Sequence, residues 1–141
     1  MRTPFLLVLS TAVAVLAGCA TPAVKEMRTG RDAFRRAWHD AEDSNWEVCA
    51  MNLATSLQHM KEGVGVEPVR QTESGRVDLS PYLKAMESGP WPKLQAAVRQ
   101  HDMEQFQQAY VGAVNACATC HTAAGRPTLC LRLPEDCLVQ P

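Results

Sequence analysis

The sequence lacks an excess of charge of either sign. Its 141 residues include 14 Lys and Arg against 15 Asp and Glu, which leaves a formal net charge of −1 at pH 7. Proteins that bind nucleic acids carry clusters of Lys and Arg, because these side chains displace the counterions of the phosphate backbone. We therefore expect no nucleic-acid partner.

The sequence also lacks a hydrophobic run long enough to cross a membrane comfortably. The apolar run near the start, Phe5 to Ala17, is interrupted by Ser10 and Thr11, whereas a spanning helix needs roughly 20 apolar residues. Arg2 precedes the run and small residues follow it, which is typical of an export signal that is removed from the mature protein. We therefore assign residues 1–18 to a signal peptide.

The run ends in Leu16-Ala17-Gly18-Cys19, which resembles a bacterial lipobox. The resemblance implies cleavage before Cys19 and attachment of lipid to its thiol, so that the protein is held at the periplasmic side of a bacterial membrane. Residues 19–23 would then form a lipidated tether and residues 24–141 a single domain. The alternative is an ordinary signal peptide that is cut elsewhere, with Cys19 incidental.

A second C-x-x-C motif and a βαβ pattern are both missing from the sequence. The first absence argues against a zinc site, which needs a fourth ligand, and the second argues against a thioredoxin-type redox motif. The C-x-x-C that is present reads Cys117-Ala118-Thr119-Cys120-His121, and C-x-x-C-H is the attachment signature of a c-type haem. We predict one covalent haem c, bound through Cys117 and Cys120, with His121 as the proximal iron ligand.

Three further cysteines have no assigned role: Cys49, Cys130 and Cys137. An exported protein enters an oxidising compartment, so we expect one pair to join. We favour Cys130–Cys137, because they are close in sequence and flank Pro134, with Cys49 as a buried thiol on a helix. The alternative is a disulfide between Cys49 and either of the other two, which would pin the C-terminal tail to the second helix.

Apolar residues recur at helical spacing in four main stretches. These are residues 24–42, 45–62, 92–101 and 102–121, with a short helical piece at 82–86 and an aperiodic loop at 63–79. Gly125 and Pro127 stop the last helix, and residues 128–141 are expected to fold back as an irregular strap. We predict an all-α fold, an antiparallel four-helix bundle with a haem site near its C-terminus.

The last of these helices carries the haem motif. Asp102 can cap its N-terminus, with Gln105 three residues later, as in a capping box. Its inward stripe, at spacings of three or four residues, is made of Phe106, Tyr110, Ala113, Cys117 and His121. We therefore expect the haem to lie inside the bundle.

A C-x-x-C-H motif at the end of the last helix of four resembles the class II cytochromes c, which are the cytochrome c′ group and its six-coordinate relatives. The sequence resemblance is concentrated in Asn45-Trp46-Glu47 and in residues 106–127. It implies a monohaem bundle whose first helix covers the distal face of the haem. It also implies a homodimer, because class II bundles often pair through their first two helices. One position departs from the cytochrome c′ group, in which a basic residue usually stands four positions after the haem histidine, whereas here Gly125 stands there and Arg126 follows.

The resemblance also bears on the sixth iron position. Met27 lies early on the first helix, where six-coordinate relatives carry their methionine, and it is the candidate distal ligand. Met51 and Met60 are alternatives, and an open, five-coordinate iron is a further one. Phe34 and Trp38 are the other inward candidates of the first helix.

Other polar residues near the expected haem are given more ordinary roles. Arg31 interrupts the core stripe of the first helix, and is either a surface arginine or a partner for a haem propionate. His39 is expected to face away from the haem. His59 lies between the core positions Leu57 and Met60 and is expected to face solvent, and His101 lies at the corner between the third and fourth helices. None of these histidines is a good second ligand.

Met/His ligation closes the iron and suits electron transfer. The predicted function is therefore that of a membrane-tethered cytochrome that passes single electrons to and from a redox partner protein. We expect no enzyme, because the cofactor carries the chemistry and the protein tunes it. The alternative is a five-coordinate, cytochrome c′-like protein that binds nitric oxide or carbon monoxide as a sensor or scavenger.

Overall fold

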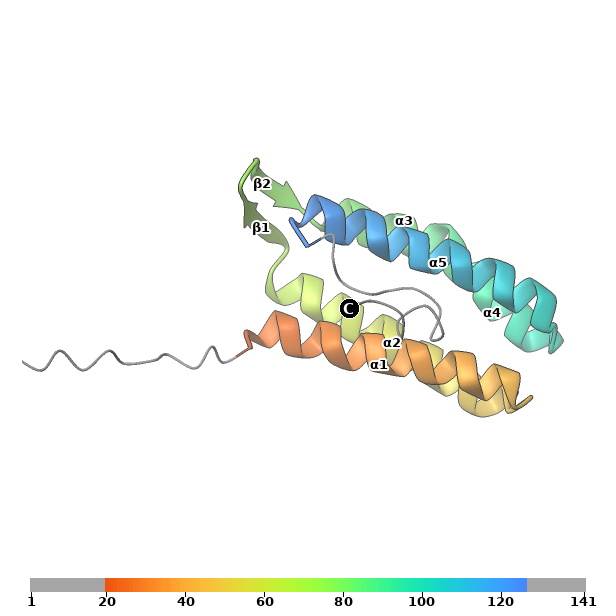
Figure 1. Ribbon diagram of the computed structural model, residues 1–141. Helices are drawn as coiled ribbons and strands as arrows, with labels where there is room; N and C mark the ends of the chain where they lie inside the picture. Colours follow the sequence, from red (N-terminus) through yellow and green to blue (C-terminus); the bar gives the residue numbers. More distant parts are fainter. Residues whose placement is uncertain (1–19, 127–141) are drawn as a thin grey trace, which may run out of the picture.

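The described part of the chain is mostly helical. The computed structural model describes residues 20–126, which form five helices and one short β-hairpin; Figure 1 shows their arrangement. In chain order the elements are α1 (Pro22–Glu42), α2 (Trp46–Val66), β1 (Val69–Thr72), β2 (Gly75–Asp78), α3 (Ser80–Ser88), α4 (Pro90–Gln100) and α5 (Met103–Ala123). The prediction of a helical protein is therefore confirmed in outline, with the hairpin as an unpredicted addition.

Several predictions fall outside the described residues. They concern the signal peptide at 1–18, the lipid on Cys19, the Cys130–Cys137 pair and the C-terminal strap. Within residues 20–126, no helix is both long enough and apolar enough to cross a membrane.

The first helix begins earlier than its apolar spacing predicts. Thr21 caps it, because the Thr21 hydroxyl accepts a hydrogen bond from the Val24 amide at 3.4 Å. Pro22 takes the first helical position, where the missing amide hydrogen costs no hydrogen bond. Residues 22 and 23, which were expected in the tether, are therefore part of the first helical turn.

Two glycines let α1 and α2 pack closely. A Cβ atom at Gly30 would lie 3.1 Å from the Ser56 carbonyl oxygen, and one at Gly63 would lie 3.0 Å from the Met27 Cε atom. A side chain at either position would force its neighbours to move, because protein interiors are close-packed. Gly63 therefore serves the packing of α2, which continues to Val66, and the predicted end of this helix at residue 62 is wrong.

A β-hairpin occupies most of the segment that was predicted to be an aperiodic loop. Its strands pair antiparallel, from Val69 opposite Asp78 to Thr72 opposite Gly75. Gly75 has a φ of 125°, a value that glycine adopts without strain, and its carbonyl oxygen accepts a hydrogen bond from the Thr72 hydroxyl at 2.8 Å. The strands are four residues long, which is too short for their alternation to stand out in the sequence.

The second half of the described chain folds into α3, α4 and α5. The helix α3 starts at Ser80 and α4 at Pro90, each two residues earlier than predicted, and Gly89 separates them. Asp102 caps α5 as predicted, because its carboxylate accepts hydrogen bonds from the Gln105 amide at 2.9 Å and from the Gln105 side chain at 2.8 Å. This cap satisfies the Gln105 amide and fixes where α5 begins.

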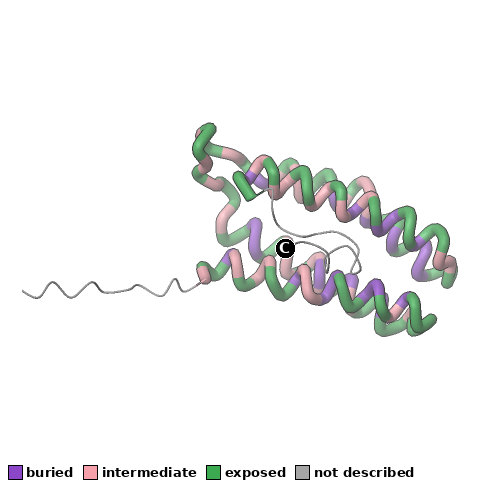
Figure 2. The backbone as a smooth tube through the Cα atoms, in the orientation of Figure 1, coloured by how far each residue is buried: buried purple, intermediate pink, exposed green. Residues whose placement is uncertain are grey.

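The helices form two layers. Figure 1 shows α1 beside α2 in one layer and α3 and α4 beside α5 in the other, with the hairpin at one end. Aromatic rings join the layers: Phe34 stacks on Tyr110 with 4.2 Å between ring centroids, and Trp38 meets the edge of Tyr110 at 4.9 Å. Figure 2 shows buried residues in both layers. Phe34 and Trp38 are buried, which confirms the predicted inward face of the first helix.

Candidate functional site

A cavity lies between the two layers, at the end of the molecule that carries the hairpin. Its volume is about 270 Å³, close to the lower end of the range for ligand pockets, which is roughly 300–1,000 Å³. The start of α1, the ends of α2 and α5, and residues of β1 and α3 line it. Val64, Leu79 and Leu83 are among its apolar lining residues, so most of its surface suits a hydrophobic group.

The structure places Cys117, Cys120 and His121 together on the wall of this cavity. Cys120 stands three residues after Cys117, and His121 stands four residues after it. Residues at these spacings share one face of a helix. All three side chains are half-buried. Their spacing predicted a common inward face, and the structure adds that the other layer supplies the facing wall, with Met27 and Met60.

The end of α5 is held by a Schellman motif. The Arg126 amide donates a hydrogen bond to the His121 carbonyl at 2.7 Å, and the Gly125 amide donates to the Thr122 carbonyl at 3.0 Å. Gly125 has a φ of 71°, the left-handed conformation that this motif requires and that glycine tolerates best. The predicted stop at Gly125 is confirmed, and the motif anchors the helical turn that presents His121.

Burial controls the ionisation of the three side chains. It raises the pKa of the Cys117 thiol to about 12, with a smaller contribution from Cys120, and it raises the pKa of the Cys120 thiol as well. Burial also lowers the pKa of His121, and the Arg126 guanidinium lowers it further. At neutral pH both thiols are therefore protonated and the imidazole is neutral, which is the state in which it binds metals.

One nitrogen of His121 has no partner among the described residues. The Nδ1 atom is buried and forms no hydrogen bond with any side chain or backbone group of residues 20–126. A buried polar atom without a partner costs about 1–3 kcal/mol. The His121 ring is therefore not committed to another group in this part of the chain.

Methionines from three helices line the cavity: Met27 from α1, Met60 from α2 and Met86 from α3. Met86 was missed, because α3 was predicted as a fragment that ended at this residue. The spacing of Leu79, Leu83 and Met86 is helical, and it could have revealed the inward face of a longer helix. Met51 is 68% exposed on α2 and does not line the cavity, so its prediction as an alternative ligand is wrong.

Guanidinium groups give the cavity a positive character. The Arg70 guanidinium pairs with Glu67 at 3.1 Å, and the Arg31 guanidinium pairs with Asp32 at 2.7 Å while its side chain stays 35% exposed. The arginines that line the cavity are Arg28, Arg31, Arg70 and Arg126. Sequence reasoning found Arg31 but missed Arg70, because Arg70 reaches the cavity only through the unpredicted hairpin.

The remaining histidines lie away from the cavity. His39 is exposed, as predicted. His101 lies at the corner between α4 and α5, as predicted, where its ring stacks on Trp46 at a centroid distance of 5.6 Å. His59 was expected to face solvent, but it is half-buried and contacts Glu26 of α1.

The lowered pKa of His121 predicts that the chain loses stability in acid when nothing is bound to this residue. In the unfolded state the ring titrates near its ordinary pKa of about 6.5, and in the folded state it titrates lower. Between these two pKa values the unfolded state binds more protons than the folded state. The free energy of unfolding is therefore highest above about pH 6.5 and falls as the pH drops below it. Urea unfolding at pH 7.5 and 5.5 measures the loss.

Substitutions separate this effect from other titrations. His121→Gln should reduce the acid loss, whereas His39→Gln, at an exposed residue, should leave it unchanged. An equal acid loss in the His121→Gln variant and the unsubstituted chain would contradict the prediction.

The chain was compared with protein-family models, with curated proteins and with solved structures, and none of them matches it.

Proposed function

We propose that this chain is a c-type monohaem cytochrome that carries single electrons on the periplasmic side of a bacterial membrane. The observation that supports this most is that Cys117, Cys120 and His121 all line one mainly apolar cavity. Two thiols and a neutral imidazole are the groups by which a C-x-x-C-H motif holds haem c. In this proposal Cys117 and Cys120 form thioether bonds and His121 is the proximal iron ligand.

Three properties of the cavity fit haem c. Its apolar walls suit a large hydrophobic ring. Its guanidinium groups, Arg31 among them, suit the two propionates, because arginine binds carboxylates strongly. The His121 ring is half-buried and neutral, and its buried Nδ1 atom has no hydrogen-bond partner within residues 20–126.

When bound, haem supplies the one-electron chemistry. The residues of the chain bind it, exclude water from it and set its surroundings. Val64, Leu79 and Leu83 exclude water, and burial keeps the His121 imidazole neutral at physiological pH. The proposed role requires no catalytic acid or base, so it is not that of an enzyme.

We infer that the helices form an antiparallel four-helix bundle of the class II cytochrome type. In this view α3 and α4 count as one helix that is interrupted at Gly89. This residue follows the last residue of α3 and precedes Pro90, the first residue of α4. The position of Cys117, Cys120 and His121 at the end of α5 supports the inference. Pairing into a homodimer through α1 and α2 stays a prediction.

Met27 is the proposed distal ligand. It belongs to the layer that faces α5, and it lies over Gly63, where a side chain would collide with its Cε atom. Met60 stands one turn before Gly63 on α2 and lines the same wall of the cavity, so it is the alternative distal ligand. A thioether ligand closes the iron and favours electron transfer over ligand binding.

A lipid on Cys19 would keep this cavity close to the membrane surface. The helix α1 begins at Pro22, three residues after Cys19, and three residues span at most about 11 Å. Ala23 and Val24, in the first turn of α1, line the cavity. The proposed redox partner is therefore a protein that can approach the membrane surface.

An optical spectrum of the exported protein tests the proposal. The protein, produced in a bacterium that attaches c-type haem, should keep its haem under denaturing conditions. The reduced protein should give a low-spin spectrum that carbon monoxide leaves unchanged. A chain without covalent haem would contradict the proposal as a whole. A high-spin spectrum that shifts with carbon monoxide would contradict electron carriage and support the five-coordinate alternative, a protein that binds nitric oxide or carbon monoxide.

A further inference from the structure

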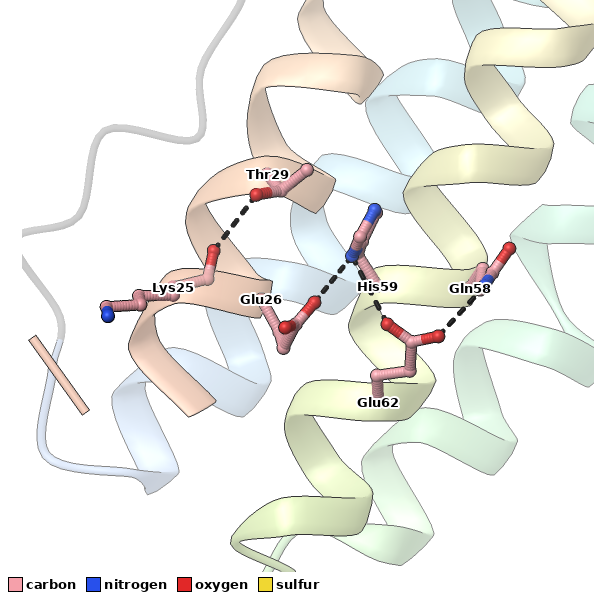
Figure 3. Close-up of polar contacts among 6 residues, drawn as sticks. All are labelled: Lys25, Glu26, Thr29, Gln58, His59 and Glu62. Atoms are coloured by element: carbon pink, nitrogen blue, oxygen red, sulfur yellow. Dashed lines mark hydrogen bonds and ion pairs between the residues drawn. The ribbon is translucent and has the colours of Figure 1, made fainter. Parts of the chain in front are cut away.

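A second cluster of metal-ligating side chains lies between α1 and α2, outside the cavity. Figure 3 shows the carboxylates of Glu26 on α1 and Glu62 on α2 converging on the ring of His59. One ligand atom from each residue lies within 4.8 Å of the other two. We propose that these three residues bind a divalent transition-metal ion of the Zn²⁺ class, which bridges the two helices.

The distances suit an ion that is shared by three ligands. Zinc binds imidazole nitrogen at about 2.0–2.1 Å and carboxylate oxygen at about 2.0–2.2 Å, so ligand atoms in a tetrahedral site lie roughly 3.4 Å apart. His59 Nδ1 lies 3.3 Å from Glu62 Oε2 and 2.5 Å from Glu26 Oε2. An ion in place of the Nδ1 proton needs only a small outward movement of the Glu26 carboxylate.

Helix packing holds His59 in place before any ion binds. Gly30 stands one turn after Glu26 on α1, and a Cβ atom at Gly30 would lie 3.3 Å from the His59 Cβ atom. This close approach leaves the His59 side chain 25% exposed and in contact with Glu26. Ligands that are already held in position bind a metal more tightly, because less conformational freedom is lost on binding.

Glu62 is oriented by a partner of its own. The Gln58 side chain donates a hydrogen bond to Glu62 Oε1 at 2.8 Å, which leaves Glu62 Oε2 directed at His59 (Figure 3). Such outer partners typically contribute about 10–100-fold to the affinity of a metal site. In the same view the Lys25 side chain points away from the cluster, so its charge does not take the place of an ion.

The ligand set selects the class of ion. One imidazole nitrogen and two carboxylate oxygens suit Zn²⁺, Cu²⁺ or Ni²⁺, whereas Mg²⁺ and Ca²⁺ prefer oxygen ligands. Three protein ligands leave a coordination position for water. Glu26 and His59 each precede a cavity methionine, Met27 and Met60, so the ion would clamp this wall from outside without entering the cavity.

The chain contains a matched pair that lacks the third ligand. His39 and Glu42 on α1 have the same spacing as His59 and Glu62, and His39 Nδ1 lies 3.1 Å from Glu42 Oε2. Among the described residues, no third ligand joins them. A substitution at His39 therefore removes an exposed histidine of the same kind but not the proposed site.

Calorimetric titration of the purified protein with ZnCl₂ tests the site. We expect one saturable Zn²⁺ ion per chain that depends on His59. Loss of a residue that only hydrogen-bonds a metal ligand typically weakens metal binding about 10–100-fold. His59→Gln removes a ligand itself, so it should weaken Zn²⁺ binding by at least about 10-fold. His39→Gln should leave Zn²⁺ binding unchanged. Glu62→Gln should weaken it by a similar factor, and this variant keeps the packing of α1 and α2 because the Glu62 side chain is 45% exposed.

Three results would overturn the proposal. The first is Zn²⁺ binding that His59→Gln and Glu62→Gln both leave intact, which would assign the ion to other groups such as the thiols of Cys117 and Cys120. The second is an equal loss in the His39→Gln variant, which would show non-specific binding to exposed histidines. No measurable binding to the unsubstituted protein would likewise overturn it, and leave Glu26, His59 and Glu62 as an ion-paired contact between helices.

Discussion

Replacing Cys117 and Cys120 by serine should abolish the covalent attachment of haem to the chain. A serine hydroxyl does not form the thioether bond by which a C-x-x-C-H motif holds haem c. Both thiols lie on the wall of one cavity beside His121, so each single substitution should leave at most one bond. The haem that stays with the polypeptide under denaturing conditions measures the effect, and we expect none in the double variant.

Cys49 provides the matched control for this experiment. It is fully buried on α2, and burial raises the pKa of its thiol to about 12, but it does not line the cavity. Cys49→Ser should keep all of the covalent haem, although a buried hydroxyl without a partner lowers the free energy of unfolding by about 1–3 kcal/mol. Covalent haem that persists in the Cys117→Ser, Cys120→Ser variant would refute the proposed attachment.

Replacing Met27 by alanine should convert a low-spin haem into a high-spin one. Met27 faces the cavity from α1, and alanine removes the thioether that is proposed to occupy the sixth iron position. The reduced variant should then bind carbon monoxide and change its spectrum, whereas the reduced unsubstituted protein should not. Replacing a fully buried methionine by alanine lowers the free energy of unfolding by about 2–5 kcal/mol. Met27 is half-buried, so the Met27→Ala substitution should lower it by less.

Two other methionines make the test specific. Met60→Ala removes a thioether from the same cavity wall, and Met51→Ala removes one from a side chain that is 68% exposed. We expect both variants to keep the low-spin spectrum. A high-spin spectrum from Met60→Ala alone would move the ligand to Met60, and an unchanged spectrum in the Met27→Ala variant would remove Met27 from the site.

Features set by local chemistry could be predicted from the sequence. The inward positions of Phe34 and Trp38 followed from helical spacing, since both are buried. The start of α5 followed from the capping side chain of Asp102, and its end from the left-handed preference of Gly125. Each of these depends on residues within one or two turns of the chain.

Features that depend on a distant partner could not be predicted in this way. Gly63 looks like a helix terminator until Met27 of α1 is seen to pack over it. The contact of His59 with Glu26 spans 33 residues of sequence, so no local pattern indicates it. The hairpin likewise depends on pairing between two strands of four residues each, and it was this hairpin that brought Arg70 to the cavity.

The order of the two layers along the chain bears on how the protein is assembled. Three residues join α1 to α2, so this layer forms through local contacts, which are the fastest to establish. The helix with Cys117, Cys120 and His121 is the last described element to leave the ribosome. The cavity therefore does not exist until α5 has been made and the two layers have met, and until then Cys117 and Cys120 are not enclosed between them. A bulky group can be enclosed during folding, and need not be threaded into a finished molecule.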